Sequence, residues 1–124
     1  MAKHSPRFLK LSEDARSGVR EISIDQVHKR LADAQPPLIV DVREDHEWSQ
    51  GHLPQAVHLG RGILERDIEQ RVPDVHAELI LYCGGGYRSA LAAESLQKMG
   101  YDNVWSMAGG WRGWRDANLP IEQP

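Results

Sequence analysis

Two short apolar runs constrain the fold of this chain more than any other feature of its sequence. The runs read Leu-Ile-Val-Asp-Val at residues 38–42 and Leu-Ile-Leu-Tyr at residues 79–82. They lack the apolar–polar alternation of a strand with one exposed face, so they indicate strands buried on both faces of a parallel sheet. Because parallel strands are joined by crossover helices, the chain is predicted to fold as an α/β domain.

Strand and helix patterns alternate through the rest of the chain. Ser23 and Gln26 have the spacing of a capping box, which predicts a helix that starts there and ends before Pro36. Apolar spacing predicts a helix at residues 63–72, and good helix formers predict another at residues 87–99. Further elements are predicted as strands at residues 19–22, 56–59 and 104–107, as a short helix at residues 44–49, and as a last helix from residue 110 on.

One domain is predicted at residues 19–120, since a chain of 124 residues lies near the commonest domain size. Residues 1–18 are polar and basic with scattered apolar positions. They are expected to form an N-terminal extension, either a tail or a short docking helix that carries Phe8, Leu9 and Leu11. Residues 121–124 are expected to form a C-terminal tail.

Composition excludes several classes of partner and cofactor. A net charge of -3 argues against nucleic acid or an anionic membrane as the main partner. No apolar run is long enough to span a bilayer, and the first ten residues lack the apolar core of a signal peptide, so we expect a cytoplasmic protein. The single cysteine, Cys83, excludes an internal disulfide and a cysteine cluster, and the six histidines lack metal-site spacing. We therefore expect neither a metal nor another cofactor.

Cys83 lies where open α/β sheets place ligands, at the carboxyl end of a buried strand. Three glycines follow it, and a helix is predicted to begin near Arg88. Three effects favour a thiolate here: inward-pointing N–H groups of the glycine turn, the positive end of the helix dipole, and the charge of Arg88. A glycine-rich turn alone would favour an inert thiol packed at the end of a strand, but the combination with the strand and Arg88 indicates a nucleophile.

Other side chains near the ends of the predicted strands are interpreted as structural. Asp41 and Arg43 follow the first buried strand, where an ion pair or hydrogen-bond network would orient the active loop rather than transfer protons. His52 is predicted to fix a turn by a side-chain hydrogen bond. The tryptophans are interpreted as packing in the core or at its rim. For Trp48, a second interpretation is that it lines the mouth of the site. Tyr87 either shapes donor access or covers the start of the helix.

Three signatures resemble those of the rhodanese domain, in the family's order and spacing over about residues 19–120. Cys83-Gly-Gly-Gly-Tyr-Arg88 resembles the active-site loop, in which a cysteine and an arginine bracket four residues. Leu38-Ile-Val-Asp-Val-Arg43, followed by Glu47 and Gly51-His-Leu-Pro54, resembles the upstream signature. Gly100-Tyr101, Val104 and Gly109-Gly110-Trp111, followed by Trp114, resemble the C-terminal signature.

The resemblance implies a rhodanese-like fold, a mostly parallel five-stranded sheet with helices on both faces. It also implies a thiosulfate sulfurtransferase type of enzyme, in which Cys83 takes a sulfane sulfur from a donor such as thiosulfate. The resulting persulfide would pass its sulfur to cyanide or to a thiol. Thioredoxin or a sulfur-carrier protein could be such an acceptor. The implied residues are the nucleophile Cys83, the persulfide-binding Gly84, Gly85, Gly86, Tyr87 and Arg88, and the supporting Asp41 and Arg43.

Two other functions share these signatures. Related phosphatases and arsenate reductases use a nucleophilic cysteine, but their loops place five residues between cysteine and arginine, whereas this loop has four. A non-catalytic interaction or sulfur-carrier module is the second alternative, although inactive relatives commonly lack the cysteine. Well-studied members that use thiosulfate often carry basic residues within the loop, whereas this loop has none between Cys83 and Arg88, so the identity of the donor is left open.

Overall fold

Five parallel strands form the central sheet of the computed structural model, which describes residues 4–124. The predicted five-stranded α/β sheet is confirmed, and its neighbouring strands pair in parallel in the order β1-β5-β4-β2-β3. The strands are β1 (Arg20–Ile22), β2 (Leu38–Asp41), β3 (Val57–His58), β4 (Leu79–Tyr82) and β5 (Val104–Met107). This order places β4 between β5 and β2, at the centre of the sheet.

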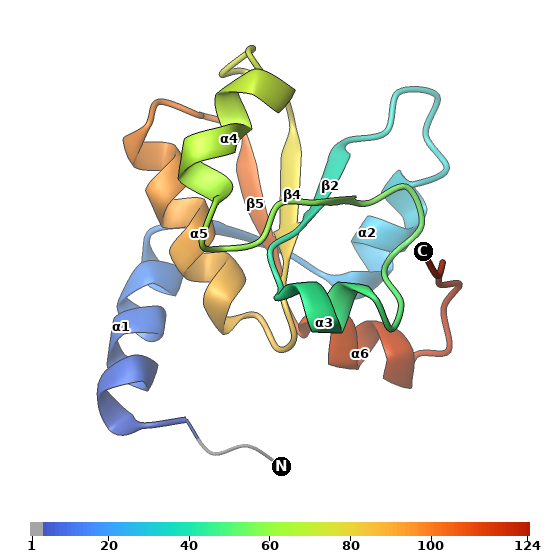
Figure 1. Cartoon of the computed structure of the whole chain (residues 1–124), viewed down its shortest axis with the longest axis horizontal. Helices are drawn as coiled ribbons and strands as arrows, with labels where there is room; N and C mark the ends of the chain where they lie inside the picture. The colour runs from blue at the N-terminus through green and yellow to red at the C-terminus, as the bar shows by residue number, and fades with distance from the viewer. Residues whose placement is uncertain (1–3) are drawn as a thin grey trace.

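Helices cover both faces of the sheet (Figure 1). One face carries α4 and α5, with α1 packed along α5, and the other carries α2 and α6. The short α3 lies near the carboxyl ends of the strands. The helices are α1 (Pro6–Ser17), α2 (Ile24–Arg30), α3 (Asp45–Trp48), α4 (Leu64–Arg71), α5 (Tyr87–Lys98) and α6 (Gly110–Asp116).

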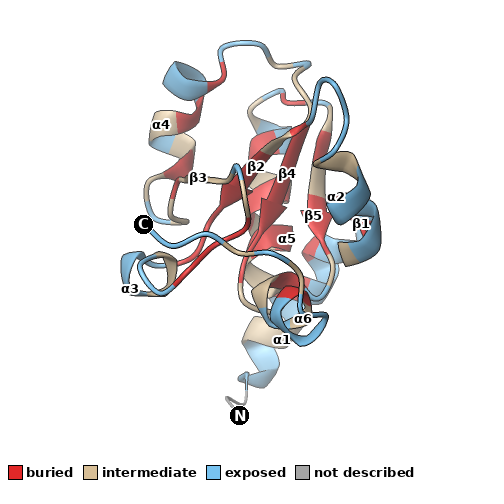
Figure 2. Ribbon diagram, turned by 90° about the vertical axis from the view of Figure 1, so that its right-hand side faces the viewer, coloured by how far each residue is buried: buried red, intermediate tan, exposed pale blue. Residues whose placement is uncertain are grey.

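Side chains along β2 and β4 alternate between the two layers of helices. Val40 and Leu81 pack in the cluster that includes residues of α4 and α5, whereas Ile39, Ile80 and Tyr82 pack with residues of α2 and α6. These side chains are fully buried, which explains the continuous apolar runs in the sequence (Figure 2). The alternation continues past the end of β4, so Cys83 belongs to the same cluster as Leu81.

The helix that starts at the Ser23–Gln26 capping box ends earlier than predicted. Both hydrogen bonds of the capping box form, which confirms the predicted start. The helix ends at Arg30 instead of continuing to Pro36. Beyond it, Ala32 and Asp33 donate backbone hydrogen bonds three residues back, so the chain leaves the helix through tight turns before the prolines.

The N-terminal extension contains the helix α1. Residues 1–3 lie outside the described part of the chain. Ser5 caps it by accepting a hydrogen bond from the Phe8 amide, at 3.4 Å. The buried residues of the helix are the small Ser12 and Ala15, which suit close packing of α1 on α5. Leu11 lies away from this face and is 58% exposed, whereas Phe8 and Leu9 are partly buried.

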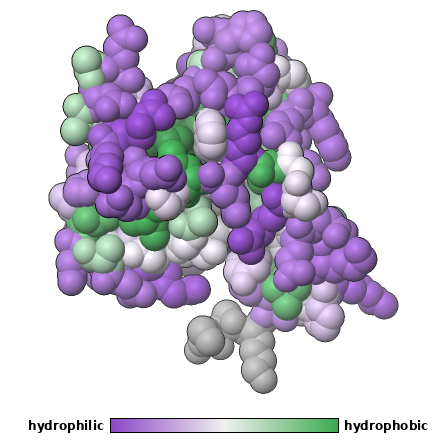
Figure 3. Space-filling model, turned by 180° about the vertical axis from the view of Figure 1, so that it is seen from behind, coloured by the Kyte–Doolittle hydropathy of each residue, from purple (hydrophilic) through white to green (hydrophobic). Residues whose placement is uncertain are grey.

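The C-terminal residues are also held against the domain. Glu122 and His52 exchange two backbone hydrogen bonds, of 2.8 and 2.9 Å, and so form an isolated antiparallel bridge. The segment expected as a tail therefore pairs with the Gly51–Pro54 turn. The face seen from behind is largely hydrophilic, with smaller hydrophobic patches (Figure 3). Within residues 4–124, none of the helices has the length and apolar character needed to cross a bilayer.

Candidate active site

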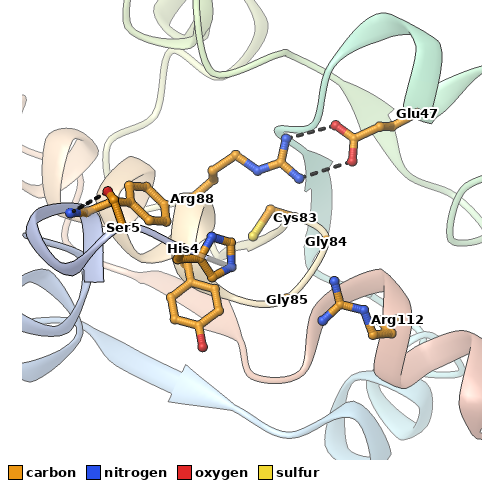
Figure 4. Close-up of a pocket in the computed structure, with 10 residues that line it drawn as sticks. His4, Ser5, Glu47, Cys83, Gly84, Gly85, Arg88 and Arg112 are labelled. Carbon is orange, nitrogen blue, oxygen red and sulfur yellow. Dashed lines mark hydrogen bonds and ion pairs between the residues drawn. The ribbon is translucent and has the colours of Figure 1, made fainter. Parts of the chain in front are cut away.

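Cys83 lies at the bottom of a pocket of about 540 Å³ at the carboxyl end of β4 (Figure 4). The residue is only 1% exposed, so a reagent reaches its sulfur only by entering the pocket. The pocket is lined by residues of the loop, of α3, of α6 and of the N-terminal segment. They are His4, Ser5, Phe8, Glu47, Cys83, Gly84, Gly85, Tyr87, Arg88 and Arg112.

The Cys83 sulfur is held by hydrogen-bond donors from the start of α5. The amides of Gly86 and Ser89 donate to Sγ at 3.1 and 3.3 Å. The thiol in turn donates to the Ser89 hydroxyl at 3.5 Å, and this hydroxyl contacts the Ser106 hydroxyl at 2.8 Å. When the thiol loses its proton, the Ser89 hydroxyl can turn and donate to sulfur. The arrangement therefore favours negative charge on this sulfur.

The three loop glycines have two different roles. Gly86 has a φ of +100° and is the N-cap of α5, so its backbone requires glycine in order to aim its amide at the sulfur. Gly84 and Gly85 have no positive φ. A Cβ at Gly84 would lie 3.1 Å from an Arg88 guanidinium nitrogen, and one at Gly85 would lie 3.4 Å from a guanidinium nitrogen of Arg112. These two glycines leave space for the cations of the pocket.

The first turn of α6 fixes the loop from the other side. The amide of Trp111 donates to the Cys83 carbonyl at 2.7 Å, and the amide of Arg112 donates to the Gly84 carbonyl at 3.0 Å. This close approach depends on Gly110, which has a φ of +57°. A Cβ at this position would lie 2.5 Å from the Cys83 carbonyl oxygen. Backbone hydrogen bonds on both sides therefore hold Cys83 in place.

Arg88 forms a bidentate ion pair with Glu47, with N–O distances of 2.8 and 3.1 Å. The Arg88 hydrogen bonds lower the pKa of the Glu47 carboxyl to about 2. Glu47 also accepts a hydrogen bond from the Glu44 amide at 3.0 Å, which ties the pair to the start of α3. Arg88, expected to place a positive charge near the thiol, is thus paired with a carboxylate.

Glu47→Gln is expected to destabilise the protein at neutral pH by about 1–2 kcal/mol, because it removes a charged hydrogen-bond pair that is partly exposed. The Glu47 pKa is lower in the folded protein, about 2, than its ordinary value of 4.5. The stabilisation is therefore complete above about pH 4.5 and declines as the pH falls towards 2. Urea unfolding of both proteins between pH 3 and 8 measures this. A stability difference that grew below pH 4.5 would contradict the assignment.

Asp41 and Arg43 lie beneath the site instead of inside the pocket. They are fully buried and paired at 2.7 Å, and Arg43 also donates to the Gly51 carbonyl at 2.7 Å. The Tyr82 hydroxyl donates to Asp41, and burial together with this carboxylate raises the pKa of Tyr82. The Arg43 guanidinium lies 4.6 Å from the ring of Trp111, whose amide holds the Cys83 carbonyl. The expected ion-pair network is present, and it reaches the loop through Trp111.

Trp48 does not line the pocket. It stacks on His52 at 3.6 Å and on His58 at 5.0 Å between ring centroids. His52 makes the predicted side-chain contact, from Nδ1 to the Leu53 carbonyl at 2.9 Å. In residues 4–124, no group of three histidine, cysteine, aspartate or glutamate side chains is placed to hold a metal ion.

Several residues that line the pocket or contact the sulfur were not predicted as members of the site. Ser89 follows Arg88 directly, so its place in the first turn of α5 could have indicated an amide aimed at the sulfur. Glu47 was noted only as part of a family signature. Arg112 and the N-terminal residues His4, Ser5 and Phe8 come from distant elements, and no local sequence pattern marks their approach to Cys83.

This fold and this loop define an α/β domain with a cysteine cradled at the end of its central strand. The chain belongs to the rhodanese-like domain family, whose model matches residues 23–117. It is 33% identical over 106 residues to a protein named sulfurtransferase from Allochromatium vinosum, a match that covers 86% of this chain and 97% of the relative. It is 31% identical to thiosulfate sulfurtransferase GlpE of Shewanella oneidensis, over 82% of this chain and 98% of that protein.

A solved structure from Rhodopseudomonas palustris superposes with a TM-score of 0.81 at 30% identity, over 98% of this chain and 99% of the other. That protein is described as being of unknown function and as a possible tyrosine phosphatase. The relatives named as sulfurtransferases support sulfur transfer of the rhodanese type for this family. The matched range starts after α1, so the N-terminal part of the pocket lies outside the family model.

Proposed function

We propose that this protein is a thiosulfate sulfurtransferase-type enzyme that carries a sulfane sulfur on Cys83 as a persulfide. The observation that carries this proposal is the pair of amides, from Gly86 and Ser89, that donate to a buried sulfur at the bottom of a pocket. Such donors stabilise a thiolate before the reaction and a negatively charged terminal sulfur after it.

The proposed half-reactions need no external oxidant or reductant. The Cys83 thiolate attacks the outer sulfur of the donor, the new S–S bond forms, and the donor's S–S bond breaks with its electron pair leaving on the other fragment. With thiosulfate, that fragment is sulfite. In the second half-reaction, cyanide or a thiolate attacks the terminal sulfur of the persulfide, which forms thiocyanate or a new persulfide and returns the Cys83 thiolate.

Each loop residue has a proposed part in these steps. The Gly86 amide already donates to the sulfur, the amides of Gly84, Gly85, Tyr87 and Arg88 are proposed to surround the terminal sulfur of the persulfide, and Ser89 adds a hydroxyl at its base. Arg88, oriented by Glu47, lies beside the sulfur. Asp41 and Arg43 act as supporting residues through Trp111. The low exposure of the site strengthens these interactions, because little water competes for them.

The proposed partners are a small sulfur donor and an acceptor that is cyanide or a thiol, with a cytoplasmic location. A protein acceptor such as thioredoxin or a sulfur-carrier protein fits the same chemistry. One relative, from Bacillus subtilis, is named a putative sulfur carrier protein and is 31% identical over 83% of this chain, which spans 54% of that protein.

An intact-mass measurement tests the proposal. The reduced protein is incubated with a panel of donors that includes thiosulfate, an organic thiosulfonate and polysulfide. We expect a gain of one sulfur atom that cyanide or dithiothreitol removes, with release of thiocyanate in the case of cyanide. A protein that gains no sulfur from any donor would contradict a sulfurtransferase and favour a non-catalytic module.

A phosphatase assay distinguishes sulfur transfer from the phosphatase activity that the description of the Rhodopseudomonas palustris structure suggests for that protein. The loop places four residues between Cys83 and Arg88, and Glu47 already occupies the guanidinium that would bind a phosphate. We therefore expect no turnover of an aryl phosphate. Turnover that is lost in Cys83→Ser would reverse the assignment.

A further inference from the structure

Part of the pocket over Cys83 is built by residues that precede the family's matched range. His4, Ser5 and Phe8 line the pocket, while the family model begins at residue 23. Together with Tyr87 of the loop, they place aromatic rings beside the site. The ring of His4 lies 4.5 Å from that of Tyr87 and 5.1 Å from that of Phe8, and the Phe8 and Tyr87 centroids are 6.2 Å apart. We call His4, Phe8 and Tyr87 the aromatic wall.

The aromatic wall is anchored to the same helix that carries the active loop. Phe8 belongs to the first turn of α1, which packs on α5, and Tyr87 is the first residue of α5. The Ser12 hydroxyl, which is buried, donates to the Phe8 carbonyl at 2.8 Å and so fixes the backbone of that turn. The rings are therefore held at a defined position next to Cys83.

The charge of the pocket limits the anions that it suits. Glu47 balances Arg88, and among residues 4–124 no ion pair involves Arg112. Arg112 lies across Cys83 from His4 (Figure 4). One unpaired cation offsets one negative charge. Thiosulfate carries two negative charges, so Arg112 would leave one of them without a counter-charge. It also has no apolar surface that could pack on the aromatic wall.

We propose that the pocket selects organic sulfane-sulfur donors with a single negative charge and an apolar body, and that Phe8 and Tyr87 determine this specificity. The inference rests on the proposed function. An aromatic thiosulfonate has these features: its ring packs on the aromatic wall while Arg112 pairs with the sulfonyl oxygens. The Cys83 thiolate attacks the outer sulfur, the new S–S bond forms, and the donor's S–S bond breaks to release the sulfinate with the electron pair. Charge balances without a redox partner.

Three donors and matched variants test the proposal. Benzenethiosulfonate and methanethiosulfonate carry the same charge and differ in the ring, and thiosulfate adds the second charge. The rate of persulfide formation on Cys83 is measured for each donor and divided by the rate with free cysteine, which removes differences in intrinsic reactivity. We expect the wild type to prefer benzenethiosulfonate to methanethiosulfonate, and methanethiosulfonate to thiosulfate.

Phe8→Ala is expected to lower the preference for benzenethiosulfonate over methanethiosulfonate by about 3–10-fold, the size of one aromatic contact. Tyr87→Leu, which keeps apolar packing at the start of α5, should lower it in the same direction. Leu11→Ala is the control, because Leu11 lies on the same helix, is 58% exposed and does not line the pocket. It should leave all three rates unchanged.

Each outcome is informative. If the wild type accepts all donors and both Phe8→Ala and Tyr87→Leu keep its preference, the specificity proposal is wrong and sulfur transfer stands. A wild type that favours thiosulfate after normalisation overturns the charge argument. If no donor modifies wild-type Cys83, the proposed sulfurtransferase function itself is wrong, and the specificity proposal that rests on it is wrong as well.

Discussion

Cys83→Ser is expected to lower sulfur transfer by about a thousandfold or more, because the variant has no atom that can carry the sulfur. Serine fits the site of the thiol, and its hydroxyl can still contact Ser89. It remains protonated near neutral pH, however, and does not form a persulfide. The amides of Gly86 and Ser89 would still be aimed at an oxygen, but without a nucleophile they stabilise nothing.

The measurement is the rate of thiocyanate formation from the best donor and cyanide, together with intact mass after donor treatment. Circular dichroism and thermal unfolding control for the fold, since a small and nearly isosteric change should shift stability by less than about 1 kcal/mol. Alkylation of the wild type offers an independent route to the same loss, because Cys83 is the single cysteine. Transfer in Cys83→Ser within tenfold of the wild type would rule out the persulfide.

Gly110→Ala is expected to disturb both the fold and the loop. The left-handed φ of +57° costs alanine about 1–2 kcal/mol, and a Cβ at 2.5 Å from the Cys83 carbonyl adds about 1–3 kcal/mol of overpacking. The sum lowers the melting temperature by on the order of 10 °C for a chain of this size. The start of α6 must move away from the loop, which weakens the hydrogen bond from Trp111 to Cys83.

Gly62→Ala is the matched control for Gly110→Ala. Gly62 is exposed, has no positive φ, and its added Cβ would meet nothing within 4 Å. Its melting temperature should therefore change by no more than about 2 °C. Sulfur transfer by Gly110→Ala, measured below its own melting temperature, should fall by about tenfold or more, since displacing a reacting atom by a fraction of an ångström is costly. Equal behaviour of the two variants would show that α6 does not position Cys83.

Local signals made much of the fold predictable. The apolar run at residues 79–82 has the same bounds as β4, and the capping box at Ser23 and Gln26 forms as expected. These features depend on neighbours in sequence, which is why they can be recognised there. The end of α2 was predicted too late in the chain, and the sequence did not decide whether residues 1–18 form a tail or a helix. Both depend on tertiary packing, such as the fit of Ser12 and Ala15 against α5, that no local pattern encodes.

The same distinction applies to the site. Cys83, the glycines and Arg88 follow one another along the chain, so the sequence could group them, and the structure brings them together around the sulfur. The ion pair between Arg88 and Glu47 could not be predicted in the same way. It depends on the tertiary approach of Glu47 in α3 to Arg88 in α5, which are 41 residues apart in the chain. Arg112 likewise enters only because α6 packs against the loop through Gly110.

The position of His4 and Phe8 has a practical consequence for how the protein is handled. An affinity tag or fusion partner joined to the chain just before His4 would be attached next to a side chain that lines the pocket over Cys83, and we expect it to obstruct donors or a protein acceptor. In the C-terminal segment, Glu122 pairs with His52, and the chain ends well away from α1 (Figure 1). Purification handles, immobilisation and reporter fusions are therefore better joined after Glu122 than before His4.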